Sequence, residues 1–494
     1  MGRAKAVMLQ GTMSNVGKSF LTAALCRIFT EEGYRTAPFK SQNMALNSYI
    51  TADGSEIGRA QAVQAMAAGI EPSALMNPVL LKPTTDVGSQ VIVNGRVRGN
   101  MRARDYFARK KELIPEIMGA YERLSEEYDL IVIEGAGSPA ELNLKKDDIV
   151  NMGLAKLVKA PVVLVGDIDR GGVFAQLLGT LDLLEEDERQ LVKGLIVNGF
   201  RGDRRLFEDG VRILEERGGR PVLGVVPYIE CDIEDEDSLA GRLQKEGPFR
   251  GEGDIDIAVI RLPRISNFTD LDVFGQYDGV SVRYVRKAED LGRPDLLIIP
   301  GTKSTAADME WLRESGMERA VLDCAGEGVP VFGICGGYQM MGLSISDPEN
   351  AEGGAEINGM GLLNSRTVFE REKRQVRTAG KFLSPGGFFG CLAGADFYGY
   401  EIHMGRTADE GQPLTDAGGS WQGNAAGCYI HGIFDSADVS GRLVRALYER
   451  RGIRSHGRAV SMDSYRQEQF DLMAAGVREA LDIKKIEEIF LRGV

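Results

Sequence analysis

The chain has 494 residues, of which 43% are hydrophobic and 27% charged, a length and balance typical of a globular protein with two or three domains. The net charge of −13 argues against a nucleic-acid partner, because non-specific binding to phosphates needs a basic surface. The apolar runs are no longer than strands, so we expect no membrane span, and six cysteines without a C-x-x-C pair indicate a reducing, cytoplasmic location without structural zinc.

Residues 1–230 alternate strand and helix patterns, which predicts an α/β domain with a parallel sheet. A helix is predicted at residues 18–32, after the first strand. Apolar runs bounded by Gly, Pro, Asp or Asn predict strands at residues 4–10, 35–40, 129–134, 161–167, 194–198 and 221–226. Ligands of open parallel sheets gather at the carboxyl ends of the strands, so the residues that follow these strands are the first candidates for a site.

Residues 231–253 are acidic and then rich in Gly, which predicts an exposed connection between two domains. Residues 254–450 are expected to form the second α/β domain, and residues 451–494, which have helical spacing, a C-terminal helical tail. The strand pattern of the second domain falls at residues 254–260, 280–285, 295–300, 329–334 and 427–431.

A phosphate-binding loop follows the first predicted strand. Residues 11–19 read Gly-Thr-Met-Ser-Asn-Val-Gly-Lys-Ser, and a helix is predicted directly after them, which is the context that such a loop requires. Lys18 is expected to bridge the outer phosphates of ATP, and the Ser19 hydroxyl to bind Mg²⁺. The other residues expected to hold the nucleotide in this loop are Gly11, Thr12, Asn15, Val16 and Gly17.

Three further residues are candidates for the chemistry at these phosphates. Glu134 ends a predicted strand and is the preferred second Mg²⁺ ligand, since hard cations favour oxygen; an ordinary surface carboxylate is the alternative. Asp53, in Thr-Ala-Asp-Gly, is a weaker third metal ligand. Lys40 ends the second predicted strand, and its ammonium is expected to stabilise a phosphoryl group in transfer.

A second candidate site lies more than 300 residues further along the chain. Residues 333–339 read Gly-Ile-Cys-Gly-Gly-Tyr-Gln, directly after an apolar strand and before a predicted helix. Such a tight elbow presents the thiol at the turn, near the N-terminus of the helix, where the thiol is accessible and the helix dipole favours its thiolate form. Cys335 is therefore the candidate nucleophile. The N–H of Gly336 and an N–H in the Gly301 loop are the candidate oxyanion donors.

A cysteine nucleophile needs a base, and the chain has only three histidines. His431 ends a predicted strand and is the preferred base, because it can project onto the same face as Cys335. His403 is the alternative, although a histidine at a strand end is often only a hydrogen-bonded structural group.

The Cys335 elbow resembles the G-x-C-x-G-x-Q motif of class I glutamine amidotransferases. The resemblance implies a glutamyl thioester at Cys335 and a contact with glutamine from Gln339. Most members of that family have a glutamate two positions after the histidine, where this chain has Ile433. The cobyrinate amidases share this departure, which implies that a Cys–His dyad suffices, and Asp435 is not assigned as a third member.

The N-terminal half is similar to dethiobiotin synthetase, whose phosphate loop has the same lengthened form and which transfers the γ-phosphoryl group of ATP to a carboxylate. This resemblance places Asn198 where that fold reads adenine. A carboxylate-phosphorylating domain fused to a glutaminase implies an amide-forming ligase that uses ATP, Mg²⁺ and glutamine.

Over essentially its whole length the chain is identified as a member of the cobyric acid synthase family. The resemblance implies amidation of the b, d, e and g carboxylates of a corrinoid, adenosylcobyrinic acid a,c-diamide. Ser41, Gln42 and Asn43 would help to seat this substrate. The alternative is a cobyrinic acid a,c-diamide synthase, which shares both domains but acts on the a and c carboxylates. Besides the two site motifs, the resemblance rests on residues 39–48, 56–61, 76–83, 134–141, 167–174, 300–305, 399–405 and 431–435.

Other classes of protein would need only part of this set. A regulatory ATPase would not need the cysteine elbow, a stand-alone glutaminase would not need Lys18, and a peptidoglycan-type amidating ligase would have a different ATP domain. Ammonia must attack the activated carboxylate in its neutral form, and it would be protonated in bulk water. We therefore expect the ammonia made at the cysteine site to pass internally to the ATP site, with the two sites facing each other in one chain or in a homo-oligomer. The corrinoid is a substrate, and no tightly bound cobalt is expected.

Overall fold

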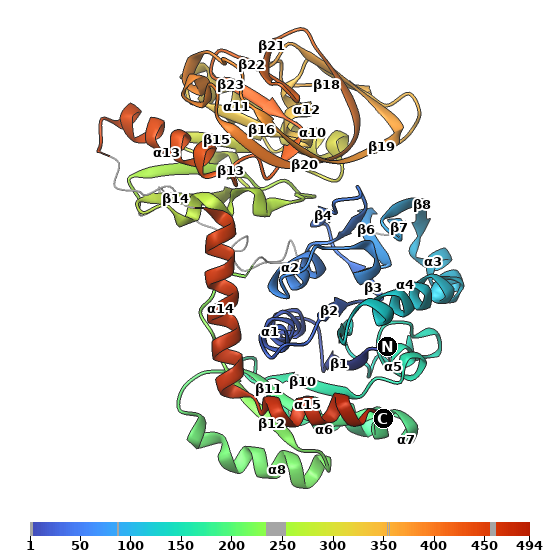
Figure 1. Cartoon of the computed structure of the whole chain (residues 1–494). Coiled ribbons are helices and arrows are strands. Elements are labelled where there is room, and N and C mark those ends of the chain that lie inside the picture. Colours follow the sequence, from blue (N-terminus) through green and yellow to red (C-terminus); the bar gives the residue numbers. More distant parts are fainter. Residues whose placement is uncertain (1–2, 86–87, 234–252, 353, 355, 455–460) are drawn as a thin grey trace. The chain divides into compact units, whose positions relative to one another are not determined.

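The computed structural model describes residues 3–85, 88–233, 253–352, 354, 356–454 and 461–494 and divides into two compact units (Figure 1). The first comprises Met1–Ala45, Ser55–Glu234 and Arg466–Val494, and the second Leu46–Gly54 and Asp235–Tyr465. Two segments therefore differ from the division expected from the sequence: Leu46–Gly54 groups with the second unit and Arg466–Val494 with the first. Most of the predicted connection at residues 231–253 lies outside the described residues.

A six-stranded sheet with all neighbouring strands parallel forms the centre of the first unit, which confirms the predicted α/β class. In sheet order its strands are β12 (Val222–Pro227), β11 (Val192–Phe200), β10 (Val162–Asp167), β1 (Lys5–Gly11), β9 (Leu130–Glu134) and β2 (Thr36–Phe39). Its helices are α1 (Lys18–Glu31), α2 (Arg59–Ala67), α3 (Ala103–Arg109), α4 (Ile114–Glu127), α5 (Met152–Val158), α6 (Val173–Leu183), α7 (Glu186–Leu191) and α8 (Glu208–Gly218).

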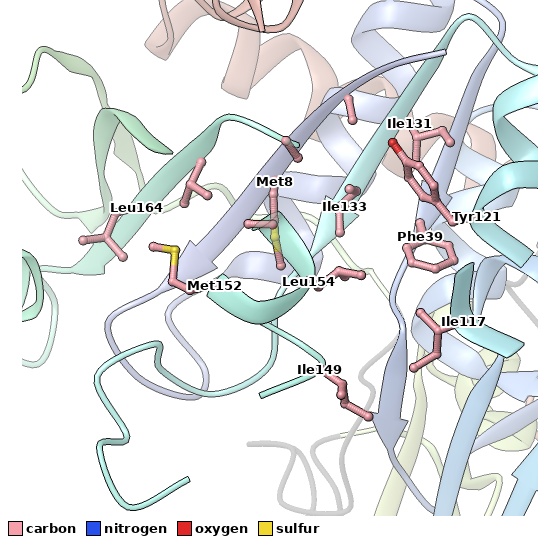
Figure 2. Close-up of a cluster of buried hydrophobic side chains, with 14 of the residues drawn as sticks. Met8, Phe39, Ile117, Tyr121, Ile131, Ile133, Ile149, Met152, Leu154 and Leu164 are labelled. Atoms are coloured by element: carbon pink, nitrogen blue, oxygen red, sulfur yellow. The ribbon is translucent and has the colours of Figure 1, made fainter. Parts of the chain in front are cut away.

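Strands β1, β9 and β10 of this sheet are buried on both faces, as their continuous apolar runs predicted. Along β1, Met8 enters one apolar cluster, whereas Val7 and Leu9 enter another, because successive side chains of a strand point to opposite faces. Figure 2 shows the first cluster, in which the rings of Phe39 and Tyr121 pack edge to face, with their centroids 5.5 Å apart.

The C-terminal helices α14 (Met462–Ala480) and α15 (Ile483–Arg492), red in Figure 1, contribute to the second of these clusters. Phe490 is fully buried, and its ring centroid lies 5.1 Å from that of Phe29 and 5.6 Å from that of Tyr34. The apolar face of α15 explains why the end of the chain groups with the first unit instead of forming a separate tail.

The first unit also contains a four-stranded sheet that the sequence did not predict. Its strands are β3 (Gln42–Met44), β6 (Val79–Thr85), β7 (Gly88–Val93) and β8 (Arg96–Arg102), with β3 parallel to β6 and the others antiparallel. The short strand β5 (Glu56–Gly58) precedes α2.

The second unit is built on a seven-stranded sheet whose first five strands are parallel. In order, they are β14 (Val280–Val285), β13 (Ile255–Ile260), β15 (Leu296–Ile299), β16 (Val331–Ile334), β23 (Ala425–Cys428), β22 (Gly418–Gln422) and β21 (Gln412–Thr415). Its helices are α10 (Thr305–Glu314), α11 (Met317–Gly326), α12 (Gly336–Met341) and α13 (Ala437–Arg451), and a 3₁₀ segment, η5, spans Phe268–Gln276.

A five-stranded sheet completes the second unit, and its long hairpin was also not predicted. The strands are β18 (Glu356–Asn358), β17 (Ser344–Ser346), β19 (Ser365–Lys381), β20 (Asp396–Asp409) and β24 (Ile430–His431). The segment Leu46–Gly54 contains strand β4 (Ser48–Ile50). Within the described ranges, no helix has the length and apolar content needed to span a bilayer.

Candidate active sites

The predicted phosphate loop joins β1 to α1 in the first unit. A Cβ on Gly11 would lie 2.5 Å from Cγ2 of Val16 and 2.9 Å from Nζ of Lys18, so the tight turn requires glycine. The Lys18 ammonium donates to the carbonyls of Met13 at 2.9 Å and Gly137 at 3.2 Å. This arrangement holds the lysine over the loop, where phosphates would bind.

Glu134, at the carboxyl end of β9, is the centre of the polar network beside the loop. Its Oε1 accepts hydrogen bonds from Ser19 Oγ at 2.8 Å and from Lys40 Nζ at 2.9 Å, and its Oε2 accepts from Gln64 Nε2 at 2.6 Å. Burial alone would raise the pKa of Glu134, but Lys40, Gln64 and Ser19 outweigh burial and lower it. The Glu134 carboxylate is therefore ionised, as a metal ligand must be, at the position where the sequence predicted a Mg²⁺ ligand.

The residues present fit a magnesium ion bound together with nucleotide phosphates. Ser19 and Glu134 supply a hydroxyl and a carboxylate oxygen, the hard ligands that Mg²⁺ prefers. In the described part of the chain no three His, Cys, Asp or Glu side chains gather as a metal cage, and Mg²⁺ commonly binds through one or two carboxylates plus phosphate oxygens.

Asp53 belongs to Leu46–Gly54 in the second unit and accepts a hydrogen bond from Thr51, and its part as a metal ligand stays a prediction. Asn198 does reach the loop: its Nδ2 donates to the Val16 carbonyl at 2.9 Å, a contact that braces the loop. The adenine contact expected of Asn198 stays a prediction.

The three residues expected to seat the substrate are engaged within the protein. Ser41 is fully buried and donates to the carbonyl of Ile149 at 2.8 Å. Asn43 donates to Gln61 Oε1 at 2.9 Å, and Gln42 accepts from the Tyr106 hydroxyl. These contacts give the stretch a structural part, and its contact with substrate stays a prediction.

The cysteine elbow joins β16 to α12 in the second unit, as the sequence predicted. Cys335 has φ 50° and ψ −107°, a sparsely populated conformation that is typical of strained functional turns. A Cβ on Gly337 would lie 1.9 Å from the Ile299 carbonyl oxygen, so the turn can approach the neighbouring strand only with glycine there. The thiol points to the carbonyl of Ile402, with Sγ 3.7 Å from the oxygen.

His431 lies against Cys335 and is held from its other side by Asp270. Its imidazole is near enough to the thiol for the thiol to affect its pKa, and its Nδ1 lies 2.7 Å from Asp270 Oδ2, while Asp270 Oδ1 accepts from the backbone N–H of Gly432 at 2.9 Å. Burial alone would lower the pKa of His431, but Asp270 and the Cys335 thiol outweigh burial and raise it to about 10. This arrangement holds a protonated imidazole beside the candidate nucleophile.

The structure therefore supplies the acidic group that the sequence did not reveal. The sequence interpretation expected a Cys–His dyad, because the position two residues after His431 is Ile433. Asp270 comes instead from η5, more than 150 residues earlier, and no spacing rule links it to the histidine. The only available signal was that Asp270 follows shortly after a strand end, at the edge where ligands gather.

The two predicted oxyanion donors lie next to each other. A Cβ on Gly336 would be 3.1 Å from the backbone N of Thr302, and one on Gly301 would be 2.8 Å from Cε1 of His431. Gln339 is buried behind them: its Oε1 accepts from the Thr305 hydroxyl at 2.9 Å, and its Nε2 donates to the Tyr429 hydroxyl at 3.2 Å. A contact of Gln339 with glutamine stays a prediction.

His403, the alternative base, belongs to the wall of a neighbouring pocket. Its ring stacks on that of Tyr429, with the centroids 3.6 Å apart, and its nitrogens lie 3.1 Å from Glu401 Oε2 and 2.7 Å from the Gly405 carbonyl oxygen. The pocket, about 470 Å³ in volume, is lined by His403, Tyr429 and Glu401 together with Arg374 and other polar residues. Both nitrogens of His403 are thus engaged away from Cys335.

The comparisons agree with this division of chemistry. Residues 7–239 match the family model described as a CobQ/CobB/MinD/ParA nucleotide binding domain, and residues 256–439 match a CobB/CobQ-like glutamine amidotransferase domain. Proteins named cobyric acid synthase are similar over the full length: 53% identity in Ruminiclostridium cellulolyticum, covering 99% of this chain and 98% of that protein, and 52% in Lachnoclostridium phytofermentans, covering 99% and 100%. A third, from Dehalococcoides mccartyi, is 48% identical over 99% of this chain and 100% of its own length. The chain belongs to the cobyric acid synthase family.

Membership of the cobyric acid synthase family confirms the resemblance inferred from the sequence, and the a,c-diamide synthase alternative is not favoured. Each matched domain contains a different one of the two sites. Glu134 and the phosphate loop lie in the nucleotide-binding match, and Cys335 and Asp270 lie in the amidotransferase match. The segment Leu46–Gly54 is the exception, since it falls in the nucleotide-binding match but packs in the second unit.

Proposed function

We propose that this protein amidates the b, d, e and g carboxylates of adenosylcobyrinic acid a,c-diamide, using ATP and glutamine. The observation that carries the proposal is the pairing, in one chain, of a Cys335–His431–Asp270 site with a phosphate loop beside the buried Lys40–Glu134 pair. A glutaminase alone does not need the second site, and an ATPase alone does not need the first. The full-length likeness to proteins named cobyric acid synthase supports the choice of substrate.

Glutamine hydrolysis begins at Cys335 in this proposal. The thiolate attacks the side-chain amide carbon of glutamine, and the Gly336 and Gly301 loop amides stabilise the oxyanion. His431 transfers its proton to the departing nitrogen, the C–N bond breaks, and ammonia leaves a glutamyl thioester. Asp270 keeps the imidazole protonated and oriented for this step. Water then hydrolyses the thioester to glutamate, and the pocket beside His403 is the proposed entry for glutamine.

The first unit activates the acceptor carboxylate, which as a resonance-stabilised anion is a poor electrophile. Lys18 and Lys40 are placed to neutralise charge that develops as the γ-phosphoryl group moves to the carboxylate. Ser19 and Glu134 would hold Mg²⁺, which supplies charge neutralisation at the phosphates when bound. Ammonia attacks the acyl phosphate carbon, the C–O bond to phosphate breaks, and the amide forms.

The proposal is tested by mass spectrometry of the corrinoid after incubation with the protein, Mg-ATP and glutamine. We expect successive exchanges of hydroxyl for amine on adenosylcobyrinic acid a,c-diamide, one for each of the b, d, e and g carboxylates. No exchange on that substrate, with exchange at the a and c carboxylates of unamidated cobyrinic acid, would instead assign the protein to the a,c-diamide synthase reaction.

A further inference from the structure

A short piece of the N-terminal half of the chain is built into the amidotransferase unit. Leu46–Gly54 packs within the second unit, although in the sequence it lies between Lys40 and Gln61, which both contact Glu134 in the first unit. The backbone and polar side chains of this segment are therefore buried in the second unit, where each polar group needs a hydrogen-bond partner. Two sets of contacts connect this segment to residues that touch the catalytic histidine.

The first route runs through Asn267, the residue before η5. Its backbone N–H donates to Asn47 Oδ1 at 2.8 Å, and its own Oδ1 accepts from the Ser48 N–H at 3.1 Å. All three residues are buried, and Asn267 is in the left-handed conformation, with φ 51° and ψ 40°. Its carbonyl accepts from the N–H of Asp270 at 3.1 Å, so the reciprocal pair of hydrogen bonds fixes the turn that presents Asp270 to the histidine.

The second route runs through Tyr400, which stacks on His431 with ring centroids 5.4 Å apart and an interplanar angle of 25°. The Tyr400 hydroxyl donates to the carbonyl of Ser48 at 3.2 Å. Ile50 forms a small apolar cluster with Tyr400 and Ile402, and the carbonyl of Ile402 is the one that the catalytic thiol approaches. The segment thus supports both the Asp270 side and the stacked side of the imidazole.

We propose that Leu46–Gly54 is a positioning strap for glutamine hydrolysis, in which Asn47 and Ser48 hold Asp270 and Tyr400 against His431. The inference rests on the proposed function, because it takes Cys335 and His431 as the glutaminase. It means that the glutaminase is incomplete without residues outside the matched amidotransferase domain at 256–439. Asn47 and Ser48 contact Asn267 and Tyr400, so both act on His431 through other residues.

The test uses the full chain with Asn47→Ala and, separately, Asn267→Gly. Glycine at 267 removes the acceptor for Ser48 but adopts the left-handed backbone without strain, so it isolates the hydrogen bond from the turn. Asn424→Ala is the matched control, because Asn424 also bonds backbone groups in this unit, donating to the Gly328 carbonyl at 2.9 Å, but lies before β23, at the end away from His431. Three quantities are measured: glutamate release from glutamine, its pH profile, and amidation with ammonium chloride.

In both strap variants we expect kcat for glutamate release to fall about tenfold or more, since small misplacements of catalytic groups have large effects on rate. The KM for glutamine should change little. The alkaline limb of the pH profile should move to lower pH, because a loosened Asp270 contact holds the imidazolium less firmly. Amidation with ammonium should stay within about twofold of wild type, as should every activity of Asn424→Ala.

A shift of the pH profile separates positioning from a loss of folded protein, which would lower the rate without moving the limb. In a double-mutant cycle, the two substitutions should be far from additive, since each breaks one of the two hydrogen bonds that together join Leu46–Gly54 to the Asn267 turn. The strap is overturned if wild-type protein releases glutamate and both variants release it at the same rate with the same pH profile. If wild-type protein releases none, the proposed function fails and the strap fails with it.

Discussion

At the scale of single residues, the glutaminase depends on the contact between Asp270 and His431. The imidazole is fully enclosed, and burial by itself would favour its neutral form. The Asp270 carboxylate, 2.7 Å away, reverses that preference and raises the pKa of His431 to about 10. An imidazolium that persists to alkaline pH can supply the proton with which the amide nitrogen leaves as neutral ammonia.

Replacing Asp270 with Asn should therefore lower both the rate and the pH range of glutamate release. Without the carboxylate charge the pKa of His431 falls, and the alkaline limb of the pH–rate profile should move down by about 1 unit or more. The rate at neutral pH should fall about tenfold to a hundredfold, because the proton donor is less available and less well oriented. Steady-state glutamate release between pH 6 and pH 10.5, measured at about half-unit intervals, tests both effects.

Asp435→Asn is the matched control, because Asp435 lies four residues after the histidine and is similarly buried, whereas the hydrogen bond to the imidazole comes from Asp270. Its alkaline limb should coincide with that of wild type. A shift in Asp435→Asn without one in Asp270→Asn would reverse the assignment of the acidic member.

At the scale of secondary structure elements, the sequence predicted what depends on local pattern. Most of the parallel strands were predictable because they are apolar runs bounded by turn residues, as in β1, β9 and β16, and the phosphate loop and cysteine elbow because their strand–turn–helix context is local. The β19–β20 hairpin was missed because β19 (Ser365–Lys381) is rich in charged residues and mostly exposed or half-buried. Asp270 was missed because tertiary structure alone brings η5 to His431.

The C-terminal helix α15 gives a prediction about stability. Phe490 is 1% exposed and packs against Phe29 and Tyr34, so Phe490→Ala should cost about 3–5 kcal/mol in the first unit. Leu491, its neighbour, is 46% exposed, and Leu491→Ala should stay within about 0.5 kcal/mol of wild type.

Urea unfolding can distinguish the two units, since both tryptophans of the chain, Trp311 and Trp421, lie in the second unit, whereas circular dichroism reports on the secondary structure of both units. In Phe490→Ala, we expect the circular-dichroism transition to begin at lower urea than the tryptophan fluorescence transition. Equal midpoints for Phe490→Ala and Leu491→Ala would show that α15 does not stabilise the first unit.

At the scale of the whole molecule, the two compact units contain separable halves of one reaction. The thiol chemistry requires only residues of the second unit, and the phosphate loop, Lys40 and Glu134 belong to the first. Ammonia is the only species that must pass between these two chemistries. Ammonia supplied from solution should therefore substitute for the ammonia that the second unit makes from glutamine. Activation of the carboxylate by the first unit should still be required.

Two substitutions should accordingly separate the nitrogen sources. Cys335→Ala should abolish amidation with glutamine but retain it with a high concentration of ammonium at high pH, where neutral ammonia is abundant, because the acyl phosphate still forms. Lys40→Met should abolish amidation with either nitrogen source, because the buried Glu134 loses its counter-ion and phosphoryl transfer loses a cation. Cys391→Ala, a cysteine substitution outside the site, should behave as wild type with both sources. The corrinoid products are measured by mass spectrometry. Amidation by Cys335→Ala with glutamine would show that Cys335 is not the nucleophile. Amidation by Lys40→Met at the wild-type rate would show that Lys40 takes no part in the activation step.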